Sequence, residues 1–137
     1  MENLKFKNGK FKIMQIADIQ EDFPVNPDTA KLISLAVKKE KPDLVVFTGD
    51  QIQGYSTCYK KDTEEKVRKV ISAFTAPITE LGIPFTMTFG NHDDDCGICK
   101  NRQRDFYALH SGFIMGEARS ESDVGTHFLS IKDSENN

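Results

Sequence analysis

The chain has 137 residues, enough for one compact domain with a core and too few for two. Hydrophobic residues make up 38% and charged residues 28%, which favours a globular protein over a disordered chain. The net charge of -3 is spread without long same-sign blocks, so nucleic acid is not indicated as a partner. No apolar run approaches the roughly 18 residues of a membrane span, so we expect a cytoplasmic protein without membrane contact.

Three cysteines are an odd count, which argues against a disulfide scaffold and fits a reducing compartment. Cys96 and Cys99 form a CGIC element that suits either a redox pair or half of a zinc site. No second CxxC or histidine cluster completes four zinc ligands. Acidic residues 93–95 directly before Cys96 should raise its pKa, which disfavours redox chemistry. Two reduced loop thiols are the favoured interpretation.

The first half of the chain alternates strand and helix signals. Residues 11–17 are rich in large apolar side chains and predict a buried strand that ends at Asp18. Asn26 and Pro27 are typical of a helix start, and apolar residues at helical spacing extend that helix to about Glu40. The all-apolar run 44–47 is typical of a central parallel strand.

A second helix and a third strand follow. Asp62 and Glu65 resemble a capping box, and Pro77 should end or kink the helix that they begin. Residues 85–89 predict a third strand, residues 102–109 a helix, and residues 126–131 a half-exposed strand. Strand, helix, strand, helix, strand indicates the α/β class, with a mostly parallel sheet flanked by helices, in a single domain over residues 1–137.

Chemically useful side chains follow each of the three strands. Asp18 and Gln20 follow the first, Asp50 the second, and Asn91 with His92 the third. The carboxyl ends of parallel strands meet at one edge of a sheet, so we expect these side chains to converge. Carboxylate, amide and imidazole groups are ligands of divalent metals, and a glycine before Asp50 and before Asn91 permits close approach.

Three segments, ADIQ at 17–20, TGDQ at 48–51 and FGNHDD at 89–94, resemble in order the first three motifs of the calcineurin-like metallophosphoesterase family. The resemblance spans about residues 11–94 and implies the amino-terminal half of that fold. It also implies hydrolysis of phosphate mono- or diesters at a two-metal site. The cofactors implied are two divalent metal ions, Mn, Fe, Zn or Mg.

The resemblance assigns a role to each motif residue. Asp18 binds the first metal, Asp50 bridges both metals, and Asn91 binds the second. His92 is the catalytic residue, which protonates the leaving alkoxide or stabilises the transition state, and Asp93 or Asp94 is expected to orient it. Tyr55, Tyr59 and residues 95–101 are expected to line the substrate pocket.

The chain also departs from the family pattern. Gln20 stands where most members have a histidine, so it is a neutral and weaker metal ligand, and Gln53 replaces a further acid. The family's later histidine motifs do not occur, and we assign His110 and His127 structural roles. We therefore expect a truncated domain that self-associates through an uncovered sheet edge. The alternative is a noncatalytic binding module with a decayed, partial metal site.

Overall fold

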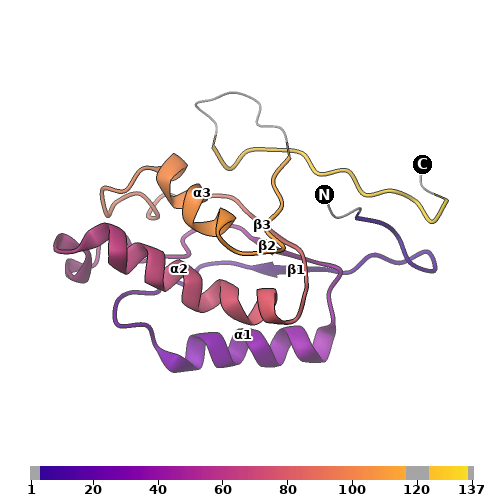
Figure 1. The fold of residues 1–137 in the computed structure, drawn as a ribbon, viewed down its shortest axis with the longest axis horizontal. Coiled ribbons are helices and arrows are strands. Elements are labelled where there is room, and N and C mark those ends of the chain that lie inside the picture. The colour runs from indigo at the N-terminus through magenta and orange to yellow at the C-terminus, as the bar shows by residue number, and fades with distance from the viewer. Residues whose placement is uncertain (1–3, 117–123, 136–137) are drawn as a thin grey trace.

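The computed structural model describes residues 4–116 and 124–135. Its sheet has three parallel strands in the order β1-β2-β3, namely β1 (Ile13–Ile16), β2 (Leu44–Phe47) and β3 (Phe85–Met87). The helices are α1 (Pro27–Glu40), the 3-10 turn η1 (Thr57–Lys60), α2 (Thr63–Glu80) and α3 (Lys100–Ala108). Figure 1 shows α1 and α2 side by side along the sheet, with α3 next to α2. The predicted β-α-β-α-β order and the α/β class are confirmed.

Helix α1 begins and ends where the sequence predicts. The Asn26 side chain accepts a hydrogen bond from the Asp28 backbone N–H at 2.9 Å, and Pro27 is the first helical residue. At the other end Lys41 takes a left-handed backbone, with φ 46°, and its N–H bonds the Val37 carbonyl. The helix buries Ile33 and Val37 against the core.

Helix α2 departs from the prediction at its start. Asp62 has a left-handed backbone, with φ 53°, and its side chain makes no capping hydrogen bond. A capping side chain reaches the first turn from an extended backbone, so this conformation removes the predicted capping box. Glu65 instead pairs with Lys69 at 2.7 Å on the exposed face.

Pro77 does not end α2, which continues to Glu80. Proline removes one helical hydrogen bond, but Pro77 is buried together with Phe74 and Ile78, and this packing retains the last turn. Gly82 then follows the end of the helix, with φ 66° and its N–H bonded to the Thr79 carbonyl.

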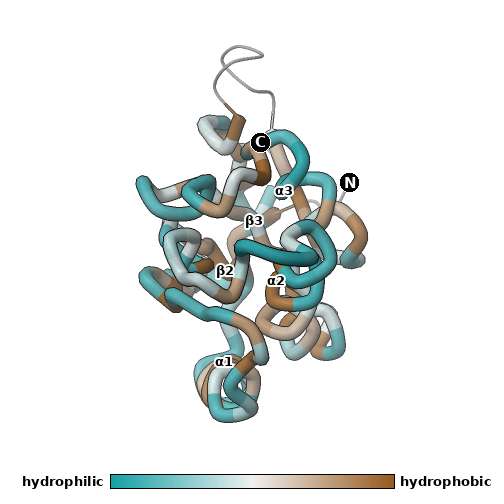
Figure 2. The backbone as a smooth tube through the Cα atoms, turned by 90° about the vertical axis from the view of Figure 1, so that its left-hand side faces the viewer, coloured by the Kyte–Doolittle hydropathy of each residue, from teal (hydrophilic) through white to brown (hydrophobic). Residues whose placement is uncertain are grey.

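The core lies between the sheet and the helices. Phe47 at the end of the central strand is fully buried and contacts Phe74, Phe85 and Tyr107, with ring centroids 5.3 to 6.5 Å apart. In the end-on view of Figure 2, β2 and β3 lie beside α2, with α1 below them. Burial of such a phenylalanine contributes about 1.5–3 kcal/mol to the free energy of unfolding. The packing of Phe47 therefore helps to fix the end of the central strand.

The two crossovers run in the same direction across the sheet, so right-handed connections place α1 and α2 on one face. Strand β1 is at the sheet edge, and its Ile13 is 52% exposed. Self-association through this edge stays a prediction. The expected strand at 126–131 is not formed: the segment contains only one isolated bridge residue, His127, and Lys132 just beyond it bridges to Lys5. Among the described residues no strand runs alongside this segment.

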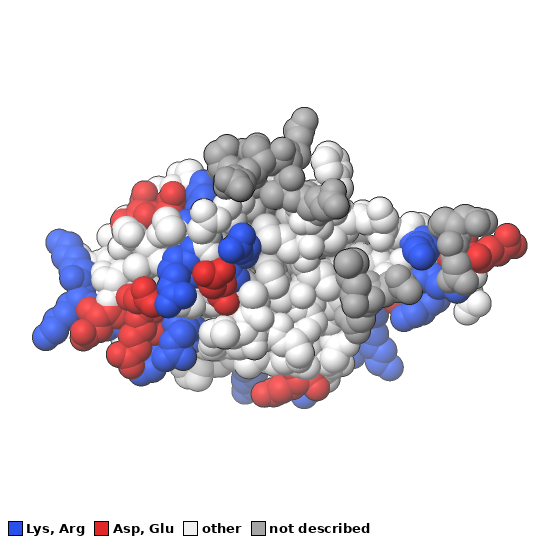
Figure 3. All heavy atoms as spheres, turned by 45° about the horizontal axis from the view of Figure 1, so that its top comes forward, with Lys and Arg blue, Asp and Glu red and all other residues white. Residues whose placement is uncertain are grey.

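Among the described residues, no helix is long and apolar enough to cross a membrane. On the face drawn in Figure 3, acidic and basic side chains are intermixed rather than sorted by sign. This agrees with the even distribution of charge along the sequence.

The cap of α1 can be tested by substitution. Asn26→Ala should lower the free energy of unfolding by about 1 kcal/mol, because it leaves the Asp28 N–H without its partner. Urea denaturation followed by circular dichroism measures the change. As a control, Glu65→Ala should have a much smaller effect, because Glu65 makes only an exposed pair with Lys69. Equal costs for the two variants would contradict the assignment of the caps.

Candidate functional site

The strand-end segments continue side by side beyond the sheet. The Asp18 N–H bonds the Gly49 carbonyl at 3.0 Å, and the Gln20 N–H bonds the Asp50 carbonyl at 2.9 Å. The His92 N–H in turn donates to Asp50 Oδ1 at 2.9 Å. The structure therefore brings all three predicted motifs to the same edge of the sheet.

Three of the predicted ligand residues have an unusual backbone conformation. Asp18, Gln20 and Asp50 have φ values of 53°, 46° and 53°, in the left-handed region that glycine normally occupies. For residues with a side chain this conformation costs on the order of 1–2 kcal/mol. The same backbone occurs at Lys41 and Asp62, where it ends or begins a helix, so it describes the turn and not a ligand role.

Two glycines let the loops after β2 and β3 meet. A Cβ at Gly49 would lie 2.7 Å from the Gly90 nitrogen, and a Cβ at Gly90 would lie 2.1 Å from Asp50 Oδ1. Both distances are shorter than real contacts, and Gly49 also has φ 118°. The predicted need for glycine before Asp50 and Asn91 is thus a need for direct contact between the two loops.

The carboxylate of Asp93 links these two loops by hydrogen bonds. Its Oδ2 accepts the backbone N–H groups of Asp50 at 2.8 Å and Gly90 at 2.7 Å, and its Oδ1 accepts that of Ile52 at 3.2 Å. The side chain is buried, with 1% exposure. Burial raises the pKa of Asp93, and the three backbone N–H groups oppose that rise. Asp93 is therefore a structural centre of the site.

Two buried glutamines extend this support. Gln103 on α3 donates to the Asp93 and Ile98 carbonyls, both at 2.8 Å, and Gln51 donates to the Thr88 carbonyl at 3.0 Å. The sequence analysis did not identify either residue. A signal was available for Gln103, which shares the helical spacing of the buried residues Phe106 and Tyr107.

His92 has one ring nitrogen engaged by an acid. Its Nδ1 lies 2.7 Å from Asp95 Oδ2, and this contact is the main reason that the pKa of His92 is raised. The prediction that Asp93 or Asp94 orients His92 is wrong. The tight turn that bonds the Asp95 N–H to the His92 carbonyl brings the third residue onward into reach, while Asp93 is occupied below.

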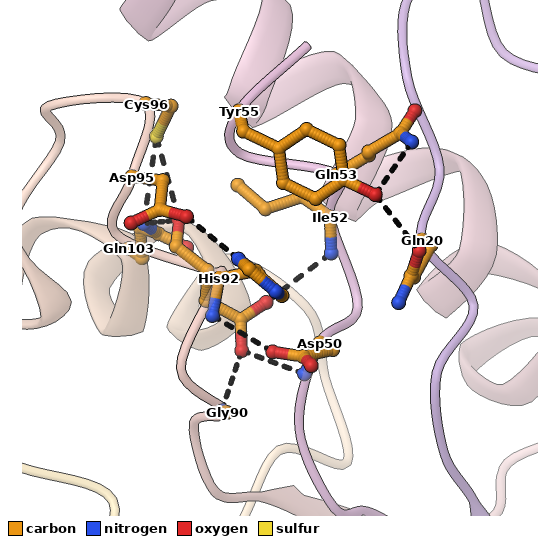
Figure 4. Close-up of polar contacts among 11 residues, drawn as sticks. Gln20, Asp50, Ile52, Gln53, Tyr55, Gly90, His92, Asp95, Cys96 and Gln103 are labelled. Atoms are coloured by element: carbon orange, nitrogen blue, oxygen red, sulfur yellow. Dashed lines mark hydrogen bonds and ion pairs between the residues drawn. The ribbon is translucent and has the colours of Figure 1, made fainter.

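Tyr55 lies against His92 in the close-up of Figure 4. The two rings are nearly perpendicular, at 69°, with centroids 4.8 Å apart. The Tyr55 hydroxyl accepts a hydrogen bond from Gln53 Nε2 at 2.8 Å and donates a long one, 3.4 Å, to Gln20 Oε1. Tyr59, in contrast, is buried, and its hydroxyl donates to the Glu21 carbonyl at 2.9 Å.

The remaining donors leave room for a cation. The side chains of Asp18 and Asn91 are exposed and make no hydrogen bond or ion pair with the described residues, and Asp50 engages one carboxylate oxygen only. Carboxylate and amide oxygens suit hard divalent cations, so the chemistry of the donors fits such an ion. In the described part of the chain, no three His, Cys, Asp or Glu side chains come close enough together to hold a metal. A cation bound here would therefore need the amide oxygens of Gln20 and Asn91 as well as the two carboxylates.

The other two histidines lie outside this arrangement, whereas Cys96 adjoins it, with Sγ 3.4 Å from the Asp93 carbonyl oxygen. His110 Nε2 is 3.1 Å from Ser72 Oγ, and His127 Nε2 is 2.8 Å from Thr86 Oγ1, contacts that link packed segments. All three cysteines are free thiols. Burial is the largest cause that raises the pKa of Cys96, with nearby acids adding to it, which disfavours a reactive thiolate.

In open α/β sheets the carboxyl ends of the strands are the usual place for a ligand site, and the acidic and amide side chains here lie at those ends. The model of the calcineurin-like phosphoesterase family matches residues 11–132, and the chain belongs to that family. Members of the family are phosphoesterases that use divalent metal ions. The resemblance of the three motifs is thereby confirmed as family membership.

Curated relatives match part of the chain. Phosphatase DCR2 of Saccharomyces cerevisiae is 36% identical over 102 residues, 64% of this chain and 17% of that protein. Probable inactive purple acid phosphatase 28 of Arabidopsis thaliana is 31% identical over 123 residues, 77% of this chain and 29% of that protein. The chain therefore spans less than a third of the length of these relatives. A solved dimetal phosphatase from Danio rerio aligns with a TM-score of 0.49 and 19% identity, covering 66% of this chain and 32% of that one.

The role of Asp93 predicts a loss of stability on substitution. Asp93→Asn should lower the free energy of unfolding by about 1–3 kcal/mol, because an amide NH₂ group replaces one acceptor among three N–H donors. Asp94→Asn, at the exposed neighbouring position, should change it by less than about 0.5 kcal/mol. Urea denaturation compares the two variants. An unchanged free energy of unfolding in Asp93→Asn would refute the structural role.

The His92–Asp95 contact predicts a measurable change in pKa. Asp95→Asn should lower the pKa of His92, because the carboxylate that favours the imidazolium is removed. Since the folded pKa is raised, the contact stabilises the fold at low pH and loses this effect as pH rises through the folded value. NMR titration of the imidazole signals, with a chelator present, measures the shift. If Asp94→Asn lowers the pKa equally, Asp95 is not the partner.

Proposed function

We propose that the chain carries part of a two-metal site that hydrolyses phosphate mono- or diesters. In this proposal Asp18, Gln20, Asp50 and Asn91 hold two divalent ions, with Asp50 between them, and His92 is the catalytic residue. The identity of the ions, Mn, Fe, Zn or Mg, follows from donor chemistry only in part, since oxygen donors favour the harder ions Mg and Mn. We also propose a reducing, cytoplasmic setting, in line with three free thiols.

The hydrogen-bonded ladder between the ligand positions carries the proposal. Asp18, Gln20 and Asp50 lie side by side at one sheet edge, where backbone bonds join the loops after β1 and β2. Their left-handed backbone alone does not mark a ligand, since Lys41 and Asp62 share it at helix ends. A cation site is supported because three oxygen donors occupy neighbouring positions at the carboxyl ends of two strands.

The residues divide the work of the reaction. Divalent ions held by Asp18, Gln20, Asp50 and Asn91 would supply activation of water and charge stabilisation for the phosphoryl oxygens. His92 donates Nδ1–H to Asp95, which favours the imidazolium and leaves Nε2–H to protonate the leaving oxygen. The backbone bond from His92 to Asp50 fixes the spacing between the acid catalyst and the ligand loop. No covalent intermediate with the protein is required.

A second candidate function is binding without catalysis. The described residues contain no cluster of three or more acidic, histidine or cysteine ligands, and the amides of Gln20 and Asn91 are neutral donors. Three relatives from Arabidopsis thaliana carry the name probable inactive purple acid phosphatase. These observations favour a protein that binds a metal or a phosphate ester but does not turn it over.

Substitution of the central acid separates these functions. Asp50→Asn should reduce hydrolysis of bis-p-nitrophenyl phosphate by at least about 100-fold and reduce bound metal, because the bridging carboxylate is lost. Activity and metal content after dialysis against Mn²⁺ are measured on the same sample. Asp94→Asn serves as the matched control and should keep both properties.

The outcomes are distinct. Metal binding without turnover in the unsubstituted chain would establish the noncatalytic alternative. Turnover and metal content that survive Asp50→Asn would refute the assignment of Asp50. Loss of both properties in Asp50→Asn alone would support the two-metal hydrolase.

A further inference from the structure

Tyr55 reaches across the candidate site from the loop that follows β2. Gly54 sets its position, because a Cβ there would lie 2.0 Å from the His92 carbonyl oxygen and 3.0 Å from the Cys96 nitrogen. The loop that bears Tyr55 thus packs in direct contact with the loop that bears His92. Figure 4 shows the Tyr55 ring between Gln20 on one side and His92 on the other.

The hydroxyl and the ring of Tyr55 have different surroundings. Gln53 and Gln20 engage the hydroxyl, and the His92 imidazole packs against the ring at 4.8 Å. Yet Tyr55 is 52% exposed. Because the polar end of the side chain is already bonded, what it offers to an incoming molecule is aromatic surface.

A pocket of about 260 Å³ opens beside this ring. Its lining includes Gly54, Tyr55, Lys60, Thr63, Asp95 and Cys96. His92 does not line the pocket, but two lining residues, Tyr55 and Asp95, contact its imidazole. The pocket therefore lies one side chain away from the group that, in the proposed function, protonates the leaving oxygen.

We propose that Tyr55 and this pocket form the subsite for the leaving group, and that the subsite favours planar aromatic alcohols over alkyl alcohols. The inference rests on the proposed function for the position of the phosphoryl group. A leaving oxygen within reach of His92 places the attached group beside Tyr55. A flat ring gains contact with the tyrosine there, whereas a small alkyl group does not. Tyr55 is in this view a specificity residue.

Binding of nonhydrolysable analogues tests the subsite without turnover. The probes are phenylphosphonate and methylphosphonate, titrated by NMR into the ¹⁵N-labelled chain with Mg²⁺ present. Tyr55→Ala should weaken phenylphosphonate by about 2- to 10-fold and leave methylphosphonate unchanged, because only the aryl group contacts the ring. Tyr55→Phe keeps the ring and should retain the preference.

Phe128→Ala is the matched control, since Phe128 is an aromatic residue that is 73% exposed and does not line this pocket. It should leave both affinities unchanged. Equal binding of the two phosphonates by the unsubstituted chain, or equal weakening of both in Tyr55→Ala, would overturn the subsite. Stability of each variant is checked by urea denaturation, so that unfolding is not mistaken for loss of binding.

The same comparison separates the subsite from the proposed function. Selective, Tyr55-dependent binding of phenylphosphonate in a chain without hydrolytic activity would support the subsite and count against catalysis. Hydrolysis in which Tyr55→Ala slows phenyl and alkyl phosphates by the same factor would support catalysis and overturn the subsite. Comparing variant to unsubstituted chain for each ester cancels the greater intrinsic reactivity of aryl esters.

Discussion

The carboxylate of Asp93 holds together the two loops on which the candidate site is built. It accepts hydrogen bonds from the backbone N–H groups of Asp50 and Ile52 in the loop after β2 and of Gly90 in the loop after β3. A buried carboxylate is costly to desolvate, and three N–H donors offset much of that cost. Among the described residues, no other side chain accepts backbone N–H groups from both loops, and the close contact of Gly49 with Gly90 lies at this junction.

Hydrogen bonds run in both directions between the two loops. Asp93 accepts the N–H of Asp50, and Asp50 in turn accepts the N–H of His92. Each loop therefore fixes a side chain of the other. The left-handed turn at Asp50 makes this exchange compatible with the continuing ladder, in which its carbonyl accepts the Gln20 N–H. Rigidity of the ligand loops thus follows from backbone bonding, whether or not a metal is bound.

The sequence predicts well what depends on local pattern. Residues 44–47 and the capped helix that starts after Asn26 match, because apolar periodicity and cap chemistry act over a few residues. It fails where backbone conformation or distant packing decides. The left-handed backbone at Asp62 removes a capping box that the sequence supports. The three consecutive acids at 93–95 also differ in their surroundings, which no local pattern predicts. Only the fold shows that Asp93 is buried and Asp95 meets His92.

The donor set has a consequence for charge. Among the four predicted ligands, only Asp18 and Asp50 are anionic, so two divalent ions would keep half of their charge uncompensated by these residues. A phosphate monoester dianion carries the opposite charge in the same amount. In the proposed two-metal site, substrate and metal binding would therefore reinforce each other, and by linkage the coupling would act in both directions. Gln20 strengthens this dependence, since its amide oxygen is a weaker donor than the imidazole that most of the family has there, although both groups are neutral.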